Sequence, residues 1–209
     1  MTKSNRINAW LAAATLGLAS VFANAQASKA PDELIKEVST DVLDSVKADK
    51  SIKDGDVRKI IALVDAKVMP HIDFQRMTAS AVGRYWRQAT PEQQKRLQDE
   101  FKILLVRTYS GALSQVQDQT VQLKPMRNGA DDKEVVVRTE VRGRGDPVQL
   151  DYRLAKEADG WKIYDVNVLG VWLVENYRNS FAQEIGANGV DGLISKLADR
   201  NKAAGAAKS

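Results

Sequence analysis

The sequence predicts an α+β protein in which helices pack on one face of a curved four-stranded antiparallel sheet. Apolar residues recur with helical spacing through the first half of the chain, up to about Val116. From Val121 to Val168 the apolar residues instead alternate with polar ones, which is the period of strands. Short turn-like connections between those strands favour an antiparallel meander, and a further helical region follows it.

Helices are expected from several start and stop signals in the first half. Pro31, followed by two acidic residues, suits a helix start, because proline fits the first turn and acids favour the positive end of the helix dipole. A second helix is expected from about Asp56 to Met69 and is ended by Pro70. A short third helix is expected after Ile72 and is closed by Gly83.

The strongest helix signal is Thr90-Pro91-Glu92-Gln93. Thr90 and Gln93 have the spacing of a capping box, and proline suits the first helical position. The helix that follows carries a wide apolar face, which requires a large partner surface. Its apolar-face positions are Leu97, Phe101, Leu104, Leu105, Thr108, Tyr109, Ala112, Leu113 and Val116.

Four strands are expected around residues 121–123, 135–142, 148–155 and 161–168. Their alternation gives the sheet one apolar and one charged face. After Gly170 the helical spacing returns and is broken at Asn188-Gly189. A short terminal helix follows, and residues 201–209 are expected to form a flexible tail.

The first 25 residues have the features of a secretory signal peptide. Lys3 and Arg6 precede an apolar stretch that is short for a membrane span, so a retained anchor is the less favoured interpretation. Ala23-Asn24-Ala25 predicts cleavage after Ala25. An exported chain without cysteine indicates a bacterial periplasm, and residues 26–200 are expected to form a single domain.

Composition excludes several classes of chemistry. The chain has no cysteine and one histidine, which rules out thiolate nucleophiles, iron–sulfur clusters and multi-histidine metal sites. A formal net charge of +4 is too small to indicate nucleic-acid binding. No serine lies in a Gly-x-Ser-x-Gly context that would pair with His71, so the chain is not expected to be an enzyme, and no metal or cofactor is expected.

Several segments, taken in order, resemble the MlaC family, also called the toluene-tolerance proteins, over about residues 31–200. They are Asp73-Phe74-x-x-Met77, Gly83-x-x-Trp86, Thr90-Pro91-Glu92-Gln93, Phe101-x-x-Leu104-Leu105-x-x-Thr108-Tyr109, Gly160-Trp161-Lys162-Ile163-Tyr164-Asp165-Val166, Gly170-Val171-x-Leu173-Val174-x-Asn176-Tyr177-Arg178-x-x-Phe181 and Gly192-Leu193-Ile194. Leu97 and Trp172 depart from the family pattern, and a tryptophan at position 172 would affect the size of a pocket.

The resemblance implies a periplasmic carrier that shuttles glycerophospholipids and maintains outer-membrane lipid asymmetry. The implied partners are an outer-membrane lipoprotein–porin complex and an inner-membrane ABC transporter with an MCE-domain subunit. The implied fold has a deep apolar cavity between sheet and helices. The candidate lipid-binding residues are Phe74, Met77, Trp86, Phe101, Leu104, Leu105, Tyr109, Val135, Val137, Leu150, Tyr152, Tyr164, Trp172, Tyr177 and Phe181.

The residues alone leave alternatives open, because a filled core and a cavity are lined by the same residue types. The arginines at positions 138, 142, 144 and 153 suit either a phosphate head group or a solvated charged face, and the interleaved acids favour the latter. Other candidate functions are a carrier of another apolar ligand (a hopanoid or a solvent) and a structural adaptor. A third is an isomerase or hydrolase of cone-shaped α+β fold using Asp165, although a structural role for this carboxylate is favoured.

Overall fold

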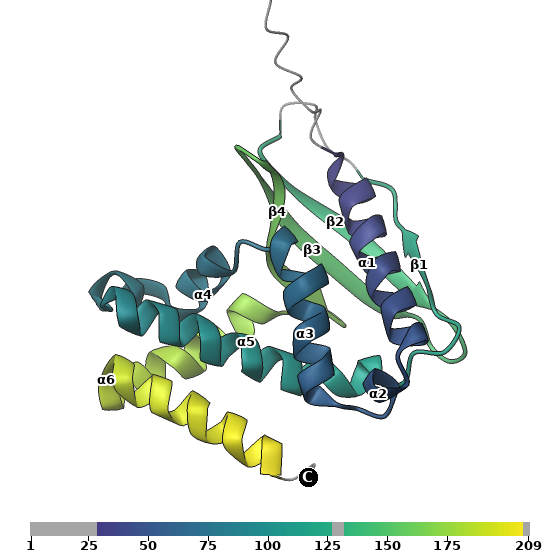
Figure 1. Cartoon of the computed structure of the whole chain (residues 1–209). Helices are drawn as coiled ribbons and strands as arrows, with labels where there is room; N and C mark the ends of the chain where they lie inside the picture. Colours follow the sequence, from purple (N-terminus) through teal and green to yellow (C-terminus); the bar gives the residue numbers. More distant parts are fainter. Residues whose placement is uncertain (1–28, 127–131, 207–209) are drawn as a thin grey trace, which may run out of the picture.

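The computed structural model describes residues 29–126 and 132–206 and confirms the α+β fold. The predicted signal peptide, residues 1–25, lies outside the described residues, and so do residues 127–131 of the connection between the first two predicted strands. Helices cover one face of the sheet and continue below it as a separate helical layer (Figure 1).

The N-terminal helices begin where the local signals predict. Helix α1 spans Pro31–Ala48 and α3 spans Val57–Lys67, joined by a single turn, α2, at Lys50–Lys53. The Asp56 carboxylate accepts the first free N–H groups of α3, which satisfies donors that have no partner inside the helix. A 3₁₀ turn, η1, at Met69–His71 follows.

A short helix, α4, and the long central helix, α5, follow. Helix α4 spans Phe74–Val82 and ends at Gly83, whose φ of +65° suits glycine. A 3₁₀ segment, η2, at Gly83–Gln88 leads to α5 at Pro91–Leu113. The predicted capping box is present, with both reciprocal hydrogen bonds between Thr90 and Gln93.

The sheet is an antiparallel meander in the order β1-β2-β3-β4-β5, so the prediction of four strands was one strand short. The strands are β1 Thr120–Leu123, β2 Glu134–Arg142, β3 Val148–Glu157, β4 Gly160–Val168 and β5 Val171–Trp172. Strand β5 has two residues, which is too short to produce an alternating pattern, and the sequence predicted the start of a helix there. It returns along β4 after a tight turn at Leu169 and Gly170.

The last helix, α6, spans Leu173–Ala206, and the predicted break is confirmed at Gly189, which has φ +74° and ψ 179°. The helix continues through residues 201–206, where a flexible tail was expected. The reason is a contact with α5: the buried Asn201 amide donates to the backbone oxygen of Glu100 at 2.9 Å and to its carboxylate at 2.8 Å.

Among the described residues, most of the buried apolar side chains form three clusters. The helical cluster joins α4, α5 and α6 and consists of Phe74, Met77, Ala81, Val82, Leu97, Phe101, Leu104, Val174, Tyr177, Phe181, Ile185, Leu193, Ile194 and Leu197. The sheet cluster lies between α1 and the sheet and consists of Leu34, Ile35, Val135, Val137, Leu154 and Ile163. The end cluster ties α1, α2, α3 and α5 together through Val46, Ile52, Ile60, Leu63, Val106 and Val116.

The sheet has an inner face toward α1 and an outer face on the opposite side. Register pairs Val137 with Tyr152 and Tyr152 with Val166, and these residues lie on the inner face. The neighbouring row pairs Val136 with Arg153 and Arg153 with Asp165, and it lies on the outer face because alternate strand residues point to opposite sides. A register shift after Arg153 leaves one extra residue in β4.

Candidate functional site

Six of the predicted lipid-binding residues are fully part of the helical cluster. Phe101 lies at its centre, with ring centroids 5.0 Å from Tyr177, 5.2 Å from Phe181 and 5.9 Å from Phe74. These edge-on and tilted contacts are the geometry of close-packed aromatic rings. The six buried residues are Phe74, Met77, Phe101, Leu104, Tyr177 and Phe181, while Trp86 and Leu105 pack half-buried at the edge of the cluster. Most of this predicted group is therefore packed core.

A second group lies on the inner face of the sheet. Val135 and Val137 are buried in the sheet cluster, and Tyr152 packs against it half-buried. Burial raises the pKa of the Tyr152 phenol, and hydrogen bonds with Ser39 and Thr139 act in the opposite direction. The Tyr152 hydroxyl thus lies between α1 and β2.

Tyr109 and Leu150 are both half-buried and belong to none of the three clusters as defined above. Burial raises the pKa of the Tyr109 phenol, and the nearby Tyr177 adds to that shift.

The helical and sheet clusters meet at an apolar seam, which we define as Ile72, Val166 and Tyr152. Ile72 and Val166 pack against both clusters, and Tyr152 is paired with Val166 across the strands. The Ile72 segment is held there by a hydrogen bond from the Asp73 N–H to the Ile163 oxygen at 2.9 Å. Ile72 and Val166 are not among the predicted lipid-binding residues, although both are apolar positions next to predicted core.

Two of the candidates, Tyr164 and Trp172, lie on the outer face of the sheet and not with the inner-face candidates. Tyr164 is the extra residue at the β4 register shift, and its hydroxyl donates to Glu134 at 3.0 Å. Trp172 lies under the guanidinium of Arg153, 3.9 Å from the ring centroid. Both rings therefore lie with the charged residues of the outer face.

Ion pairs and stacked rings organise the outer face. The Arg76 guanidinium lies 3.7 Å from the Tyr164 ring centroid and 2.6 Å from the Glu134 carboxylate. Hydrogen bonds from Arg76 and Tyr164 hold the pKa of Glu134 below its usual value. Arg153 contacts Asp165 at 3.1 Å. These pairs favour the interpretation of the strand arginines as a charged face.

Asp165, the candidate general base, is a structural carboxylate. It is 1% exposed and accepts hydrogen bonds from the Val166 N–H at 2.9 Å and the Val174 N–H at 3.1 Å. Val174 lies in the first turn of α6, so the carboxylate fixes the start of that helix to the sheet. Burial raises the pKa of Asp165, while these donors and Arg153 oppose the shift.

Replacing Asp165 with alanine is expected to cost about 2–4 kcal/mol of folding stability, because two buried N–H groups lose their acceptor. Asp165→Asn keeps an acceptor oxygen and is expected to cost about 1 kcal/mol or less. Chemical denaturation measures both losses. A loss in the alanine variant no larger than in the asparagine variant would contradict this anchoring role.

Comparing wild type with Asp165→Asn over a range of pH tests the direction of the pKa shift of Asp165. Because the folded pKa of Asp165 lies above the ordinary 3.8, the folded chain keeps this proton to a higher pH than the unfolded chain. The contribution of this group to stability is full below pH 3.8, declines as pH rises through the raised pKa, and is constant above it. The difference in stability between wild type and Asp165→Asn should follow that course.

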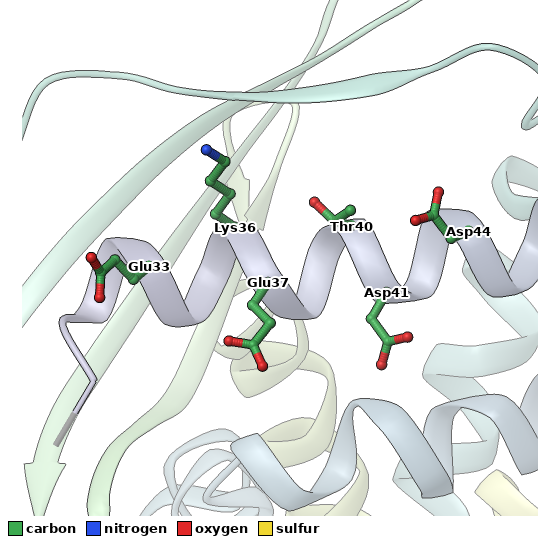
Figure 2. Close-up of a pocket in the computed structure, with 6 residues that line it drawn as sticks. All are labelled: Glu33, Lys36, Glu37, Thr40, Asp41 and Asp44. Carbon is green, nitrogen blue, oxygen red and sulfur yellow. The ribbon is translucent and has the colours of Figure 1, made fainter.

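Two surface pockets of the described residues are lined mainly by polar and charged side chains. One, of about 500 Å³, lies along the outward side of α1 and is lined by Glu33, Lys36, Glu37, Thr40, Asp41 and Asp44 (Figure 2). The other, of about 380 Å³, lies on the outer sheet face between Arg138, Arg153, Tyr164 and neighbouring residues of β2. Neither pocket is the predicted apolar cavity.

The remaining side chains with potential chemistry are dispersed. Within residues 29–126 and 132–206, no three or more histidine, cysteine or acidic residues gather as a metal site would require. No helix in these ranges is both long and apolar enough to span a bilayer. His71 is half-buried, and burial and the nearby Lys162 lower its pKa.

The fold is similar to that of a solved phospholipid-binding protein. The solved structure of the phospholipid-binding protein from Ralstonia solanacearum, in complex with a phospholipid, superposes with a TM-score of 0.81 at 48% identity. The match covers 83% of this chain and 98% of that one. The MlaC protein family model matches residues 36–199, and the chain belongs to this family.

Two curated relatives match most of the chain. Toluene tolerance protein ttg2D of Pseudomonas putida is 28% identical over 187 residues, covering 85% of this chain and 86% of the relative. The intermembrane phospholipid transport system binding protein MlaC of Haemophilus influenzae is 22% identical over 181 residues, covering 85% of each.

Proposed function

We propose that this protein is a periplasmic phospholipid carrier that shuttles lipid between the outer membrane and an inner-membrane ABC transporter. The observation that carries the proposal is the 48% identity, over 83% of this chain, to a protein solved with a phospholipid bound. The name of one curated relative, an intermembrane phospholipid transport system binding protein, agrees with it. The outer-membrane lipoprotein–porin complex and the MCE-domain subunit of the transporter are the proposed partners.

A carrier is needed because free phospholipid does not cross an aqueous gap at a useful rate. Two acyl chains hold about 30 methylenes, and exposing them costs roughly 0.8 kcal/mol each, or more than about 20 kcal/mol in all. The protein must offer apolar surface of similar affinity, and it needs no catalytic group to do so. A carrier needs apolar surfaces that can separate to admit the ligand. A core divided into clusters can separate in this way more readily than one continuous core.

We place the acyl chains along the apolar seam, between the helical and sheet clusters. The half-buried candidates Leu105, Tyr109, Leu150 and Tyr152 are the proposed contacts, because their apolar surface is incompletely covered by protein. The buried residues of the helical cluster, Phe101 among them, form the rigid wall behind this surface. The apolar cavity is thus proposed to open where the two clusters meet.

Export is the remaining part of the proposal. Residues 1–25 are proposed to direct the chain to the periplasm and to be removed after Ala25. Brief contacts through charged surfaces suit a shuttle, since tight docking would slow its release.

Purified protein, produced with its signal sequence and recovered from the periplasm, is expected to carry about one phospholipid per chain. Organic extraction followed by mass spectrometry identifies the lipid, and its phosphorus content relative to protein gives the ratio. Recovery of a hopanoid or another apolar molecule instead would favour a different carrier. Protein free of any lipid, from cells rich in phospholipid, would contradict the proposal.

A further inference from the structure

Three exposed apolar side chains lie together at one end of the sheet. Among the described residues, the large hydrophobic side chains that are exposed are Leu169 at 66%, Val171 at 49% and Val148 at 37%. Val148 begins β3, Leu169 lies in the turn after β4, and Val171 begins β5, so all three occupy the same sheet end. The Leu169 N–H donates to the Gln149 oxygen at 3.2 Å, which joins the turn to β3. We call these three residues the apolar tip.

Leu169 holds an unfavourable backbone conformation. Its φ is +52°, a region that glycine and asparagine adopt readily and leucine rarely does. The next residue, Gly170, has φ +90°, and its N–H donates to the Asn167 side chain at 2.8 Å, so the turn is well supplied with its own contacts. A strained, mostly exposed leucine contributes little to this fold, which points to a role outside it.

The apolar tip continues into the interior along one sheet face. Val168 is paired with both Leu150 and Val171. Leu150 and Val168 are half-buried and stand two residues from Tyr152 and Val166 of the apolar seam, hence on the same inner face. Apolar side chains therefore form a continuous path from solvent to the seam.

We propose that the apolar tip is the portal through which the acyl chains of a phospholipid enter and leave. The inference rests on the proposed carrier function. Acyl chains are the occupant that fits, because the path is apolar throughout and leads to the proposed binding seam. Leu169 shields the leading methylenes from water as they pass, which lowers the barrier to exchange without changing how much lipid the protein holds.

The test compares Leu169→Asn with wild type. Asparagine tolerates the left-handed conformation, so the variant is expected to fold with an equal or higher melting temperature. Lipid-loaded protein is mixed with phosphatidylethanolamine–phosphatidylglycerol vesicles, and transfer of a fluorescent phospholipid is followed with time. Transfer should slow roughly tenfold, because a polar tip no longer covers the emerging chains, while lipid per chain stays at the wild-type value.

Val136→Asn is the matched control, since it makes the same kind of polarity change on the outer face of the sheet. Its transfer rate should equal that of wild type. An unchanged rate in Leu169→Asn, or a fall in lipid per chain that accounts for the slower transfer, would overturn the portal. Wild-type protein without lipid would instead refute the carrier function, so the two failures are distinguishable.

A second measurement uses the absence of cysteine from the chain. A polyethylene-glycol maleimide attached to Leu169→Cys is expected to block transfer, and the same label on Val136→Cys is expected to leave it unchanged. Equal rates for the two labelled proteins would contradict the portal.

Discussion

Phe101→Ala is expected to lower the free energy of unfolding by about 3–5 kcal/mol. Phe101 is fully buried and contacts three other aromatic rings, so truncation leaves a cavity that surrounding helices fill only in part. Urea denaturation followed by circular dichroism measures the loss.

Two substitutions control this prediction. Phe101→Leu keeps much of the volume and should cost clearly less than alanine. Tyr164→Ala removes a half-buried ring from the outer sheet face and should cost about 1 kcal/mol. A loss below about 1 kcal/mol for Phe101→Ala would show that the helical cluster is not the packed support that its geometry indicates.

Leu105→Asp is expected to remove bound phospholipid from a protein that remains folded. Leu105 is half-buried at the edge of the helical cluster, where a carboxylate keeps part of its hydration but opposes an acyl chain beside it. Lipid per chain, measured by extraction, should fall roughly tenfold or more relative to wild type.

The controls separate lipid loss from damage to the fold. Val190→Asp introduces the same charge at another edge of the helical cluster, on the part of α6 that lies away from the sheet (Figure 1), and should retain lipid. Leu105→Met should also retain it. Val137→Asp is unsuitable, because Val137 is completely buried and a charge there would unfold the sheet cluster. Full lipid content in folded Leu105→Asp would exclude the placement along the seam.

Local signals explain why much of the fold was predictable from the sequence. Helix starts at Pro31, Asp56 and Thr90 depend on side chains within a few residues of the helix, so they are visible in the chain itself. The meander is likewise visible, because its strands are long enough to alternate.

Long-range pairing explains what was missed. Strict alternation puts Tyr164 on the same face as Val166, but the register shift beside Arg153 inserts one residue and turns Tyr164 outward and Ile163 inward. Trp172 was misplaced because a two-residue strand has no readable period. Such events depend on the partner strand, which a single sequence does not display.

The candidate site was only partly predictable for a different reason. Phe101 and Leu105 lie one turn apart on the same helix and have similar apolarity, yet one is central core and the other is edge. Whether a residue lies at the centre or at the edge of a cluster depends on how the helices and the sheet pack together. Residue type alone does not determine this position.

The division of the core has a thermodynamic consequence. Separating two clusters breaks only the contacts at their boundary, whereas unfolding also breaks the contacts within each cluster. Separating the helical and sheet clusters at Ile72 and Val166 should therefore cost less free energy than unfolding the protein. The strand hydrogen bonds within the sheet stay intact in such an opening. An apolar ligand that enters between the clusters replaces their apolar contacts with its own. The closed state and the open, ligand-bound state are then close to balanced in free energy.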